Sequence, residues 1–239
     1  RYKASKEHKP ESTWQVNFSI EKDGEVYKFT SDKQFDSVAD ANALYIKMRK
    51  AMGVEPVITA DRQLIRHADK VIFPGVGEAA TTMSFLQERG LDELIKSLTQ
   101  PVLGICLGMQ LMCRYSEEGS TNCLGIFDTE VKRFVSLLHE DKVPHMGWNT
   151  IYNLRNKGKV LNGGLGAGPG LFEGVANNSY VYFVHSYYVP VNDYTVATTD
   201  YIQPFSAAIQ KDNFYATQFH PEKSGSIGEQ ILKNFLFEI

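Results

Sequence analysis

The segment PVLGICLGMQLMCR, residues 101–114, decides the fold of this chain. It begins with the apolar residues 102–105, which predict a buried strand, and continues with apolar residues at helical spacing. Cys106 lies at the junction, with Gly104 two residues before it and Gly108 two residues after it. This spacing has the layout of a nucleophile elbow, a strained strand-to-helix turn that pushes one side chain out of a sheet. The segment therefore predicts an α/β fold with a nucleophilic thiol at the end of a strand.

A thiol at this turn lies at the start of a helix, where backbone N–H groups and the helix dipole favour the thiolate. The segment FHPEKSG, residues 219–225, supplies a base, because His220 and Glu222 point to the same side of an extended backbone. The carboxylate can then orient the imidazole toward Cys106. Nucleophile, base and orienting group are what covalent acyl chemistry requires. The alternative for a lone cysteine at the end of a strand is an inert core thiol.

Length and composition favour one sizeable α/β domain, or one domain with an appendage. The chain has 239 residues, of which 43% are hydrophobic and 22% charged, and its net charge of −3 gives no electrostatic case for binding nucleic acid. No apolar run approaches the ~20 residues of a membrane helix, and the polar N-terminus lacks the apolar core of a secretory signal. Three cysteines, an odd number, suit a reducing compartment. We expect a cytoplasmic protein that binds neither nucleic acid nor membranes.

The spacing of cysteine and histidine argues against a metal site. Besides the nucleophile, the chain has Cys113, which we expect to be buried packing, and Cys123, to which we assign no role. A zinc site built from cysteines with His139, His145 or His185 would lack the C-x-x-C and H-x₃-H spacings of such sites.

The first half of the chain is predicted to alternate strands and helices. Residues 16–20 and 26–30 predict a hairpin around Asp23 and Gly24, because Asp-Gly suits a tight turn. Helices are expected at 38–52, 62–68, 81–89 and 92–98, and strands at 56–59 and 70–73. Such alternation argues for a mostly parallel central sheet with helices on both faces.

The second half is predicted to be rich in strands. Strands are expected at 129–134, 149–152, 181–189, 195–199, 207–210 and 214–218, before a closing helix at 226–237. We interpret the glycine-rich residues 162–170 as a surface loop rather than a phosphate cradle, because they lack the Lys-Ser/Thr ending of a P-loop.

Four further motifs lie in order along the chain. They are PGVG at 74–77, PHMGWN at 144–149, YFVHSYYV at 182–189 and QFHPEKSG at 218–225. With the elbow, they resemble the class I (triad) glutamine amidotransferases, and within that family the glutaminase subunits of imidazole glycerol phosphate synthases. The resemblance covers residues 37–239, which we take as the amidotransferase domain. It implies a flavodoxin-like α/β fold.

The resemblance implies a glutaminase that serves histidine biosynthesis. Cys106 would attack the side-chain amide of glutamine, His220 would accept a proton and return it, and Glu222 would hold the imidazole. The ammonia would pass to a separate cyclase subunit, a (β/α)₈ barrel with which the chain would form a heterodimer with hydrolase and lyase activities. No metal and no organic cofactor is implied.

An oxyanion hole needs N–H donors at the place where negative charge develops. The N–H of Leu107, at the start of the helix, is one candidate. A backbone N–H around Val76 is the other, because the neighbouring Gly75 and Gly77 lower the steric cost of turning a peptide unit inward. The alternative is an ordinary strand-to-helix turn.

The resemblance also assigns residues that hold the amino-acid end of glutamine, namely Gly77, Gly108, Gln110, Glu118, His185, Ser186 and Tyr187. Gln110 is physically sensible, because it lies one turn after Cys106 on the same helix face. Glu118 could pair with the α-ammonium group or be a solvated surface charge. His185, a strand histidine beside aromatic residues, is more often packing or backbone support.

Pro144, Met146 and Trp148 are the expected docking surface for the cyclase subunit. Large apolar side chains on a turn suit the core of an interface. The alternative is a tryptophan in the protein core.

Residues 1–36 depart from the family pattern and form an atypical N-terminal segment. Family members begin with an apolar strand and a Tyr-x-x-Gly-Asn loop, whereas the stretch VYKFTSDKQFDS, residues 26–37, has no Gly-Asn. Either a divergent strand at 26–30 fills this position or the usual start has been replaced. Three other functions stay open: the glutaminase subunit of another synthase (anthranilate or guanylate type), a non-catalytic binding protein, and a free-standing cysteine hydrolase.

Overall fold

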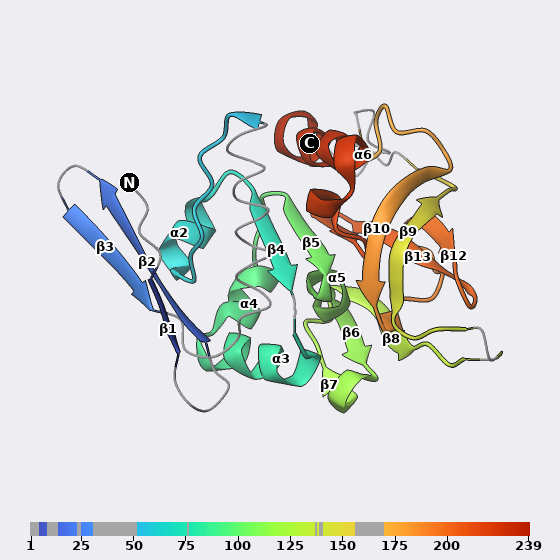
Figure 1. Ribbon diagram of the computed structural model, residues 1–239, viewed down its shortest axis with the longest axis horizontal. Coiled ribbons are helices and arrows are strands. Elements are labelled where there is room, and N and C mark those ends of the chain that lie inside the picture. Colours follow the sequence, from blue (N-terminus) through green and yellow to red (C-terminus); the bar gives the residue numbers. More distant parts are fainter. Residues whose placement is uncertain are drawn as a thin grey trace.

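The computed structural model describes residues 52–75, 77–136, 138, 141–155 and 170–239, and the backbone of residues 5–8, 14–22 and 25–30. Figure 1 shows a sheet with helices above and below it, and a part rich in strands built from the second half of the chain. This is the α/β architecture that the sequence predicts.

Five strands form the central sheet, in the order β12, β13, β14, β5, β4. Its middle is parallel, because β5 (Val102–Cys106) lies between β4 (Val71–Gly75) and β14 (Phe214–Thr217) and runs parallel to both. β13 (Pro204–Lys211) and β12 (Thr195–Asp200) continue the sheet beyond β14 in antiparallel pairing. The apolar run before Cys106 is therefore the central strand of the parallel part, and every residue of β5 is buried.

Side chains of the central sheet alternate between two hydrophobic cores, as successive residues of a strand point to opposite faces. In β5, Leu103 and Ile105 join one core and Val102 joins the other. Ile231 and Leu232 bring α6 (Gly225–Lys233) to the first core. The second core is covered by three helices: α3 (Ala79–Glu88), α4 (Leu91–Lys96) and α5 (Leu107–Met112). The predicted coverage of both faces is confirmed, and Figure 1 shows α6 at the top and α3 and α4 at the bottom.

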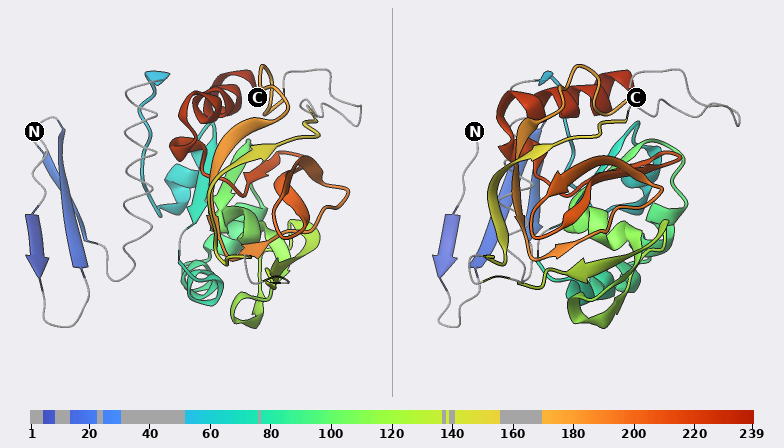
Figure 2. Two further views of the ribbon diagram at one scale, coloured as in Figure 1. Left: turned by 45° about the vertical axis from the view of Figure 1, so that its right-hand side comes forward. Right: turned by 90° about the vertical axis from the view of Figure 1, so that its right-hand side faces the viewer.

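Two smaller sheets complete the second half of the chain. β9 (His145–Ile151) and β10 (Ser179–His185) form an antiparallel pair, which Figure 2 shows as a curved ribbon. The other sheet has the order β11, β8, β6, β7, with the bounds Tyr187–Tyr188, Phe127–Arg133, Cys113–Ser116 and Thr121–Asn122. The strand predicted at 181–189 is thus two strands, interrupted at Ser186. The second half of the chain is thus rich in strands, as predicted.

At the place of the predicted hairpin, β2 (Trp14–Lys22) pairs antiparallel with β3 (Glu25–Thr30), and β1 (Ser5–His8) pairs with β2. The turn predicted at Asp23 and Gly24 lies outside the described residues. These strands form a sheet of their own, so residues 26–30 do not join the central sheet among the described strands. The predicted helix at 38–52 lies outside the described residues, except Met52. Residues 162–169 of the glycine-rich loop also lie outside them.

The strand predicted at 56–59 is wrong, because residues 53–61 form neither strand nor helix. The side chains of Val57 and Ile58 are 72% and 55% exposed. β4 lies at the edge of the central sheet and, among the described strands, pairs only with β5. A strand forms only where it can pair with a neighbouring strand, so apolar character alone does not make residues 56–59 a strand. The helix that follows, α2 (Arg62–His67), forms as predicted, with Asp61 Oδ1 accepting from the N–H of Gln63 at 2.7 Å.

Within the described part of the chain, no helix combines the length and the apolar character that crossing a bilayer requires.

Candidate active site

Cys106 lies at the sharp turn between β5 and α5, with φ 54° and ψ −110°. Positive φ is strained for a residue with a side chain and is typical of a nucleophile elbow. Gly108 makes the turn possible, since a Cβ there would lie only 2.0 Å from the carbonyl oxygen of Phe73. At Gly104 a Cβ would lie 2.9 Å from Met112 Sδ. The two glycines thus let α5 pack directly on β4 and β5, which confirms the elbow predicted from the sequence.

His220 and Glu222 come from the end of β14 and the short 3₁₀ helix Pro221–Lys223. The imidazole Nδ1 lies 2.7 Å from Glu222 Oε1, and both side chains are buried, at 2% and 3% exposed. The carboxylate accepts the Nδ1 hydrogen, so Nε2 is the nitrogen left to exchange a proton. Ser224 Oγ donates to the carbonyl of His220 at 2.6 Å and fixes this turn.

The protonated form of His220 is strongly favoured. Burial alone would lower the pKa of this imidazole, but interactions with Cys106 and Glu222 raise the pKa of His220 to about 10. Yet Nε2 is buried and has no hydrogen-bond partner among the described residues. Catalytic hydrogen bonds often tighten only when substrate binds.

Gln218 is a site residue to which the sequence reasoning gave no role. Its side chain is fully buried, and its Nε2 lies 3.7 Å from Cys106 Sγ. The thiol itself points to the carbonyl oxygen of Val184 on β10, at 3.8 Å. Gln218 is the first residue of the motif QFHPEKSG, two residues before His220. The motif therefore marks its position, but an uncharged amide side chain does not by itself indicate a catalytic role.

The residues predicted for the oxyanion hole converge on the nucleophile where they are described. Gly75 lies opposite Cys106 in the parallel pairing of β4 with β5. A Cβ on Gly75 would lie 2.6 Å from the backbone nitrogen of Gly108 and 2.8 Å from Leu107 Cβ. Val76 lies outside the described residues. The donors themselves stay a prediction, with Leu107 at the first position of α5.

The comparisons with known proteins agree with this geometry. Residues 44–239 match the family model described as "Glutamine amidotransferase class-I". This chain belongs to that family. It is 65% identical over 187 residues to the imidazole glycerol phosphate synthase subunit HisH of Bacteroides thetaiotaomicron, covering 78% of this chain and 89% of the relative.

Two further comparisons support the family and the fold. Imidazole glycerol phosphate synthase subunit HisH of Escherichia coli is 48% identical over 185 residues, covering 77% of this chain and 87% of the relative. A crystal structure of a glutamine amidotransferase superposes with a TM-score of 0.57 at 14% identity, covering 80% of this chain and 89% of that one. At that identity the structural match shows the fold alone.

Two of the residues predicted to bind substrate in this class-I amidotransferase lie near the start of α3. Gly77 is exposed, with φ 112°. Glu118 Oε2 accepts from the N–H of Ala79 at 2.9 Å, so Glu118 caps α3 from a distant part of the chain. Burial raises the pKa of Glu118, and the nearby Glu78 raises it further, against the hydrogen bond from Ala79. Glu118 is therefore more than a solvated surface charge, and its contact with glutamine stays a prediction.

The other predicted substrate residues gather between α5 and β10. Gln110 is buried, and its Nε2 donates to the carbonyl of Tyr187 and to Gln218 Oε1, both at 3.0 Å. His185 is buried against His145, with Nδ1 of His145 and Nε2 of His185 3.0 Å apart. The carbonyl of Ser186 accepts from the N–H of Phe134 at 3.0 Å. These contacts hold the segment in place and support the packing interpretation of His185.

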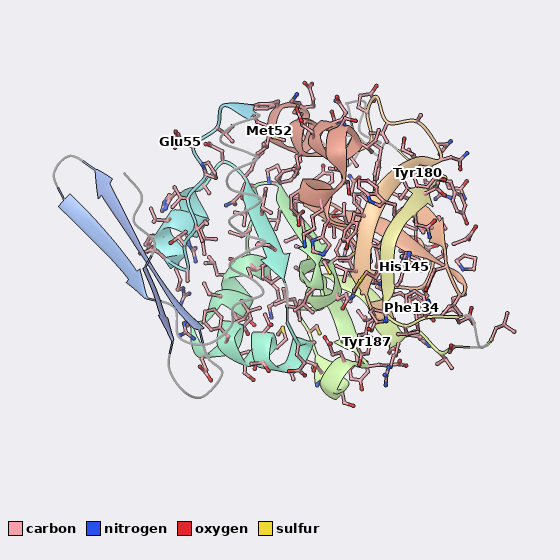
Figure 3. All side chains as sticks on the ribbon, viewed as in Figure 1. Met52, Glu55, Phe134, His145, Tyr180 and Tyr187 are labelled. Carbon is pink, nitrogen blue, oxygen red and sulfur yellow. The ribbon has the colours of Figure 1, made fainter. Side chains whose placement is uncertain are left out.

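The predicted docking residues lie on the outer face of β9. Met146 and Trp148 are 63% and 56% exposed, and Pro144 is exposed just before them. Trp148 packs edge-on against Tyr182 of β10, and Tyr180, labelled in Figure 3, is exposed on the same strand. We call Met146, Trp148, Tyr180 and Tyr182 the β9–β10 outer face. The alternative of a core tryptophan at Trp148 is wrong.

Among the described residues, no group of three or more His, Cys, Asp or Glu side chains is placed to hold a metal ion. Cys113 is buried, and burial raises the pKa of its thiol far above the usual range. Burial also raises the pKa of Cys123, to about 12. A raised pKa keeps both thiols protonated, so neither is suited to act as a nucleophile.

Proposed function

We propose that this chain is the glutaminase subunit of an imidazole glycerol phosphate synthase and hydrolyses glutamine to glutamate and ammonia. The observation that carries the proposal is the positive-φ elbow of Cys106 next to the buried pair of His220 and Glu222, 2.7 Å apart. Relatives at 48% and 65% identity carry that subunit name, which favours this function over those of other glutaminases.

The triad supports a thiol mechanism in two steps. Cys106 Sγ attacks the side-chain amide carbon of glutamine, and the resulting oxyanion would lie between the N–H of Leu107 and the loop after Gly75. Imidazolium His220 gives its Nε2 proton to the amide nitrogen as the C–N bond breaks, which releases ammonia and leaves a thioester on Cys106. Water, activated by the imidazole, then hydrolyses the thioester and releases glutamate. Glu222 keeps the ring in one tautomer and orientation throughout.

The relatives are named as subunits of a synthase, and a subunit implies a partner chain. We propose that the partner is a cyclase with a (β/α)₈ barrel that docks on the β9–β10 outer face in a heterodimer. Large exposed apolar side chains such as Met146 and Trp148 favour an interface over open solvent. Direct transfer would keep ammonia out of bulk water, where most of it would be protonated.

Glutamate release tests the proposed function. The purified chain is assayed alone and then with a barrel cyclase and its ribonucleotide substrate. Strong activation by the cyclase and its substrate together is expected. Equal activity of the isolated chain would favour a free-standing hydrolase, and no release under either condition would overturn the proposal.

A second assay separates the proposed synthase from its rivals. Anthranilate-type and guanylate-type glutaminases usually have Gly-Gly-Pro where this chain has PGVG, and they lack the HMGWN sequence. Activation by either of those synthases instead of the cyclase would overturn the assignment. The cytoplasmic location and the division of the chain between residues 36 and 37 stay predictions, and the match of the family model from residue 44 onward fits that division.

A further inference from the structure

A series of hydrogen bonds begins on the inner face of β9 and runs to β10. Asn149 Nδ2 donates to the backbone carbonyl of Asp200 at 2.8 Å and lies 3.3 Å from His145 Nε2. His145 Nδ1 lies 3.0 Å from His185 Nε2. His185 Nδ1 lies 2.6 Å from the carbonyl oxygen of Tyr187. Figure 3 labels His145 and Tyr187, near the two ends of this part.

The series continues from Tyr187 to the nucleophile. The amide of Gln110 donates to the carbonyl of Tyr187 and to Gln218 Oε1, and Gln218 Nε2 donates to Cys106 Sγ. We call the five side chains of the series the buried polar network: Asn149, His145, His185, Gln110 and Gln218. The two histidines and the two glutamines are each at most 6% exposed.

The hydrogen-bond partners fix the direction of every bond in the histidine pair. A carbonyl oxygen only accepts, so His185 Nδ1 carries a hydrogen and its Nε2 is an acceptor. His145 must then donate from Nδ1, which leaves its Nε2 to accept from Asn149. Each ring nitrogen has a partner of the matching kind. Such a fully paired buried network holds its members in one arrangement.

Both histidines are uncharged near pH 7. Burial lowers the pKa of His145 to about 4. Burial also lowers the pKa of His185 to about 3, helped by His145 and His220 and opposed by the hydrogen bond to Tyr187. Neither ring is therefore suited to serve as a second general base beside His220. The two histidines must therefore act by holding other side chains in place.

The same two strands carry the β9–β10 outer face, and one of them, β10, contacts the nucleophile. Successive residues of β9 alternate between the faces, with His145 and Asn149 inward and Met146 and Trp148 outward. On β10, Val184 is paired with Met146, and the Val184 carbonyl oxygen lies 3.8 Å from Cys106 Sγ. β9 is therefore linked to the thiol in two ways, through the network and through Val184.

From this geometry we infer that His145 and His185 are positioning residues for Cys106, because the buried polar network orients Gln218 against the nucleophile and ties it to β9. The inference rests on the proposed glutaminase function. It concerns the placement of the thiol, and it requires no proton transfer through the network.

The first test compares two variants at His145, which stacks on Tyr201 and Phe183. His145→Phe keeps a ring for stacking but removes both hydrogen bonds. His145→Asn places an amide near Nδ1 and can still donate to His185. With the cyclase present, we expect His145→Phe to lower kcat about tenfold, the equivalent of about 1.4 kcal/mol, with KM for glutamine within about twofold. His145→Asn should recover most of the loss.

The second test uses the other end of the network. Gln218→Met keeps the length of the side chain and removes its hydrogen bonds, so it should lower kcat by about the same factor. Because both variants act through one network, the double variant His145→Phe/Gln218→Met should be little slower than either single variant. Additive losses would overturn the inference. So would an unchanged kcat in either single variant, or a loss that His145→Asn does not relieve.

A control and a separate readout distinguish the possible failures. Ser206→Ala removes buried hydrogen bonds to Thr195 and Pro190, outside the network, and should leave kcat unchanged. Alkylation of Cys106 by iodoacetamide in the isolated chain, followed by mass spectrometry, needs neither glutamine nor the cyclase. If the wild-type chain releases no glutamate, the function proposal fails, while a slower alkylation of Gln218→Met and His145→Phe would still support the positioning role. Wild-type alkylation rates in both variants would overturn it.

Discussion

Cys106 acts on the pKa of His220, and the strain at the elbow places the thiol at the end of β5 where it can do so. The thiol side chain is forced out of the sheet at φ 54°, toward an imidazole that Glu222 already holds. The pKa of His220 in the folded protein, about 10, lies above its ordinary value. The charge of His220 therefore stabilises the fold fully below about pH 6.5, and this contribution is lost as the pH rises toward 10.

Replacing the thiol should change the imidazole. Cys106→Ala removes the interactions with Cys106 that raise the pKa of His220 and leaves burial and Glu222, so the pKa of His220 should fall. Titration of the imidazole by NMR measures this, and the variant should also have no glutaminase activity. An unchanged His220 pKa would mean that the thiol does not face this ring.

Gly108 should tolerate no side chain, because a Cβ there meets backbone that cannot move alone. In Gly108→Ala the methyl would lie 2.0 Å from the carbonyl of Phe73, so β4 or α5 must shift. We expect the free energy of unfolding to fall by about 1–3 kcal/mol, the range for overpacked sites. Gly104→Ala is the milder comparison, since its closest contact is the flexible Met112 side chain at 2.9 Å and the nearest backbone atoms, in Gly108 and Met109, lie 3.0 Å away. Denaturant unfolding compares the two, and a larger loss in Gly104→Ala would contradict this account.

At the scale of elements, sequence patterns predict the features that depend only on residues close together in the chain. The elbow around Cys106 and the pairing of His220 with Glu222 depend on residues close in sequence, and both were predicted correctly. The buried polar network depends on partners far apart, since Gln110 and Gln218 are separated by 108 positions. No spacing rule marks such a contact. For the same reason the apolar residues 56–59 indicated a strand, although strand formation depends on a neighbour elsewhere in the chain.

Glu118, at the start of α3, has two proposed roles that can be tested separately: capping the helix and binding glutamine. Its pKa is raised chiefly by burial, so ionised Glu118 destabilises the fold at pH values above its ordinary pKa. Glu118→Gln keeps an oxygen for the N–H of Ala79 and removes the charge. The variant should be more stable than the wild type near pH 7 and equally stable near pH 4, as thermal unfolding at the two pH values would show.

The same variant reports on the substrate. If Glu118 pairs with the α-ammonium group of glutamine, KM should rise in Glu118→Gln although the protein is more stable. A stabilised variant with unchanged KM would assign Glu118 to the capping of α3 alone.

At the scale of the whole molecule, the β9–β10 pair joins the outer face to the active site. Trp148→Ala removes a large side chain that is 56% exposed, so the free energy of unfolding should change by less than about 0.5 kcal/mol. Affinity for the cyclase should fall by about 2 kcal/mol, roughly 30-fold, if Trp148 is an interface hot spot. Calorimetry with the cyclase and thermal unfolding of the isolated chain measure the two effects.

Val191→Ala is the matched control, because Val191 is 51% exposed and lies outside the β9–β10 outer face. It should change neither quantity. A large loss of stability in Trp148→Ala with unchanged affinity would contradict the docking role.

The one-sided pairing of β4 has a consequence for handling the protein. Among the described strands β4 is bonded only to β5, so within the described part of the chain no strand pairs with its other side. Pro74 lacks an N–H and disfavours pairing near the carboxyl end of this edge. The earlier part of β4 lacks such protection, and the exposed apolar side chains of Val57 and Ile58 add to the hazard. Self-association through this edge should therefore increase with concentration, and storage of dilute samples is the sounder practice.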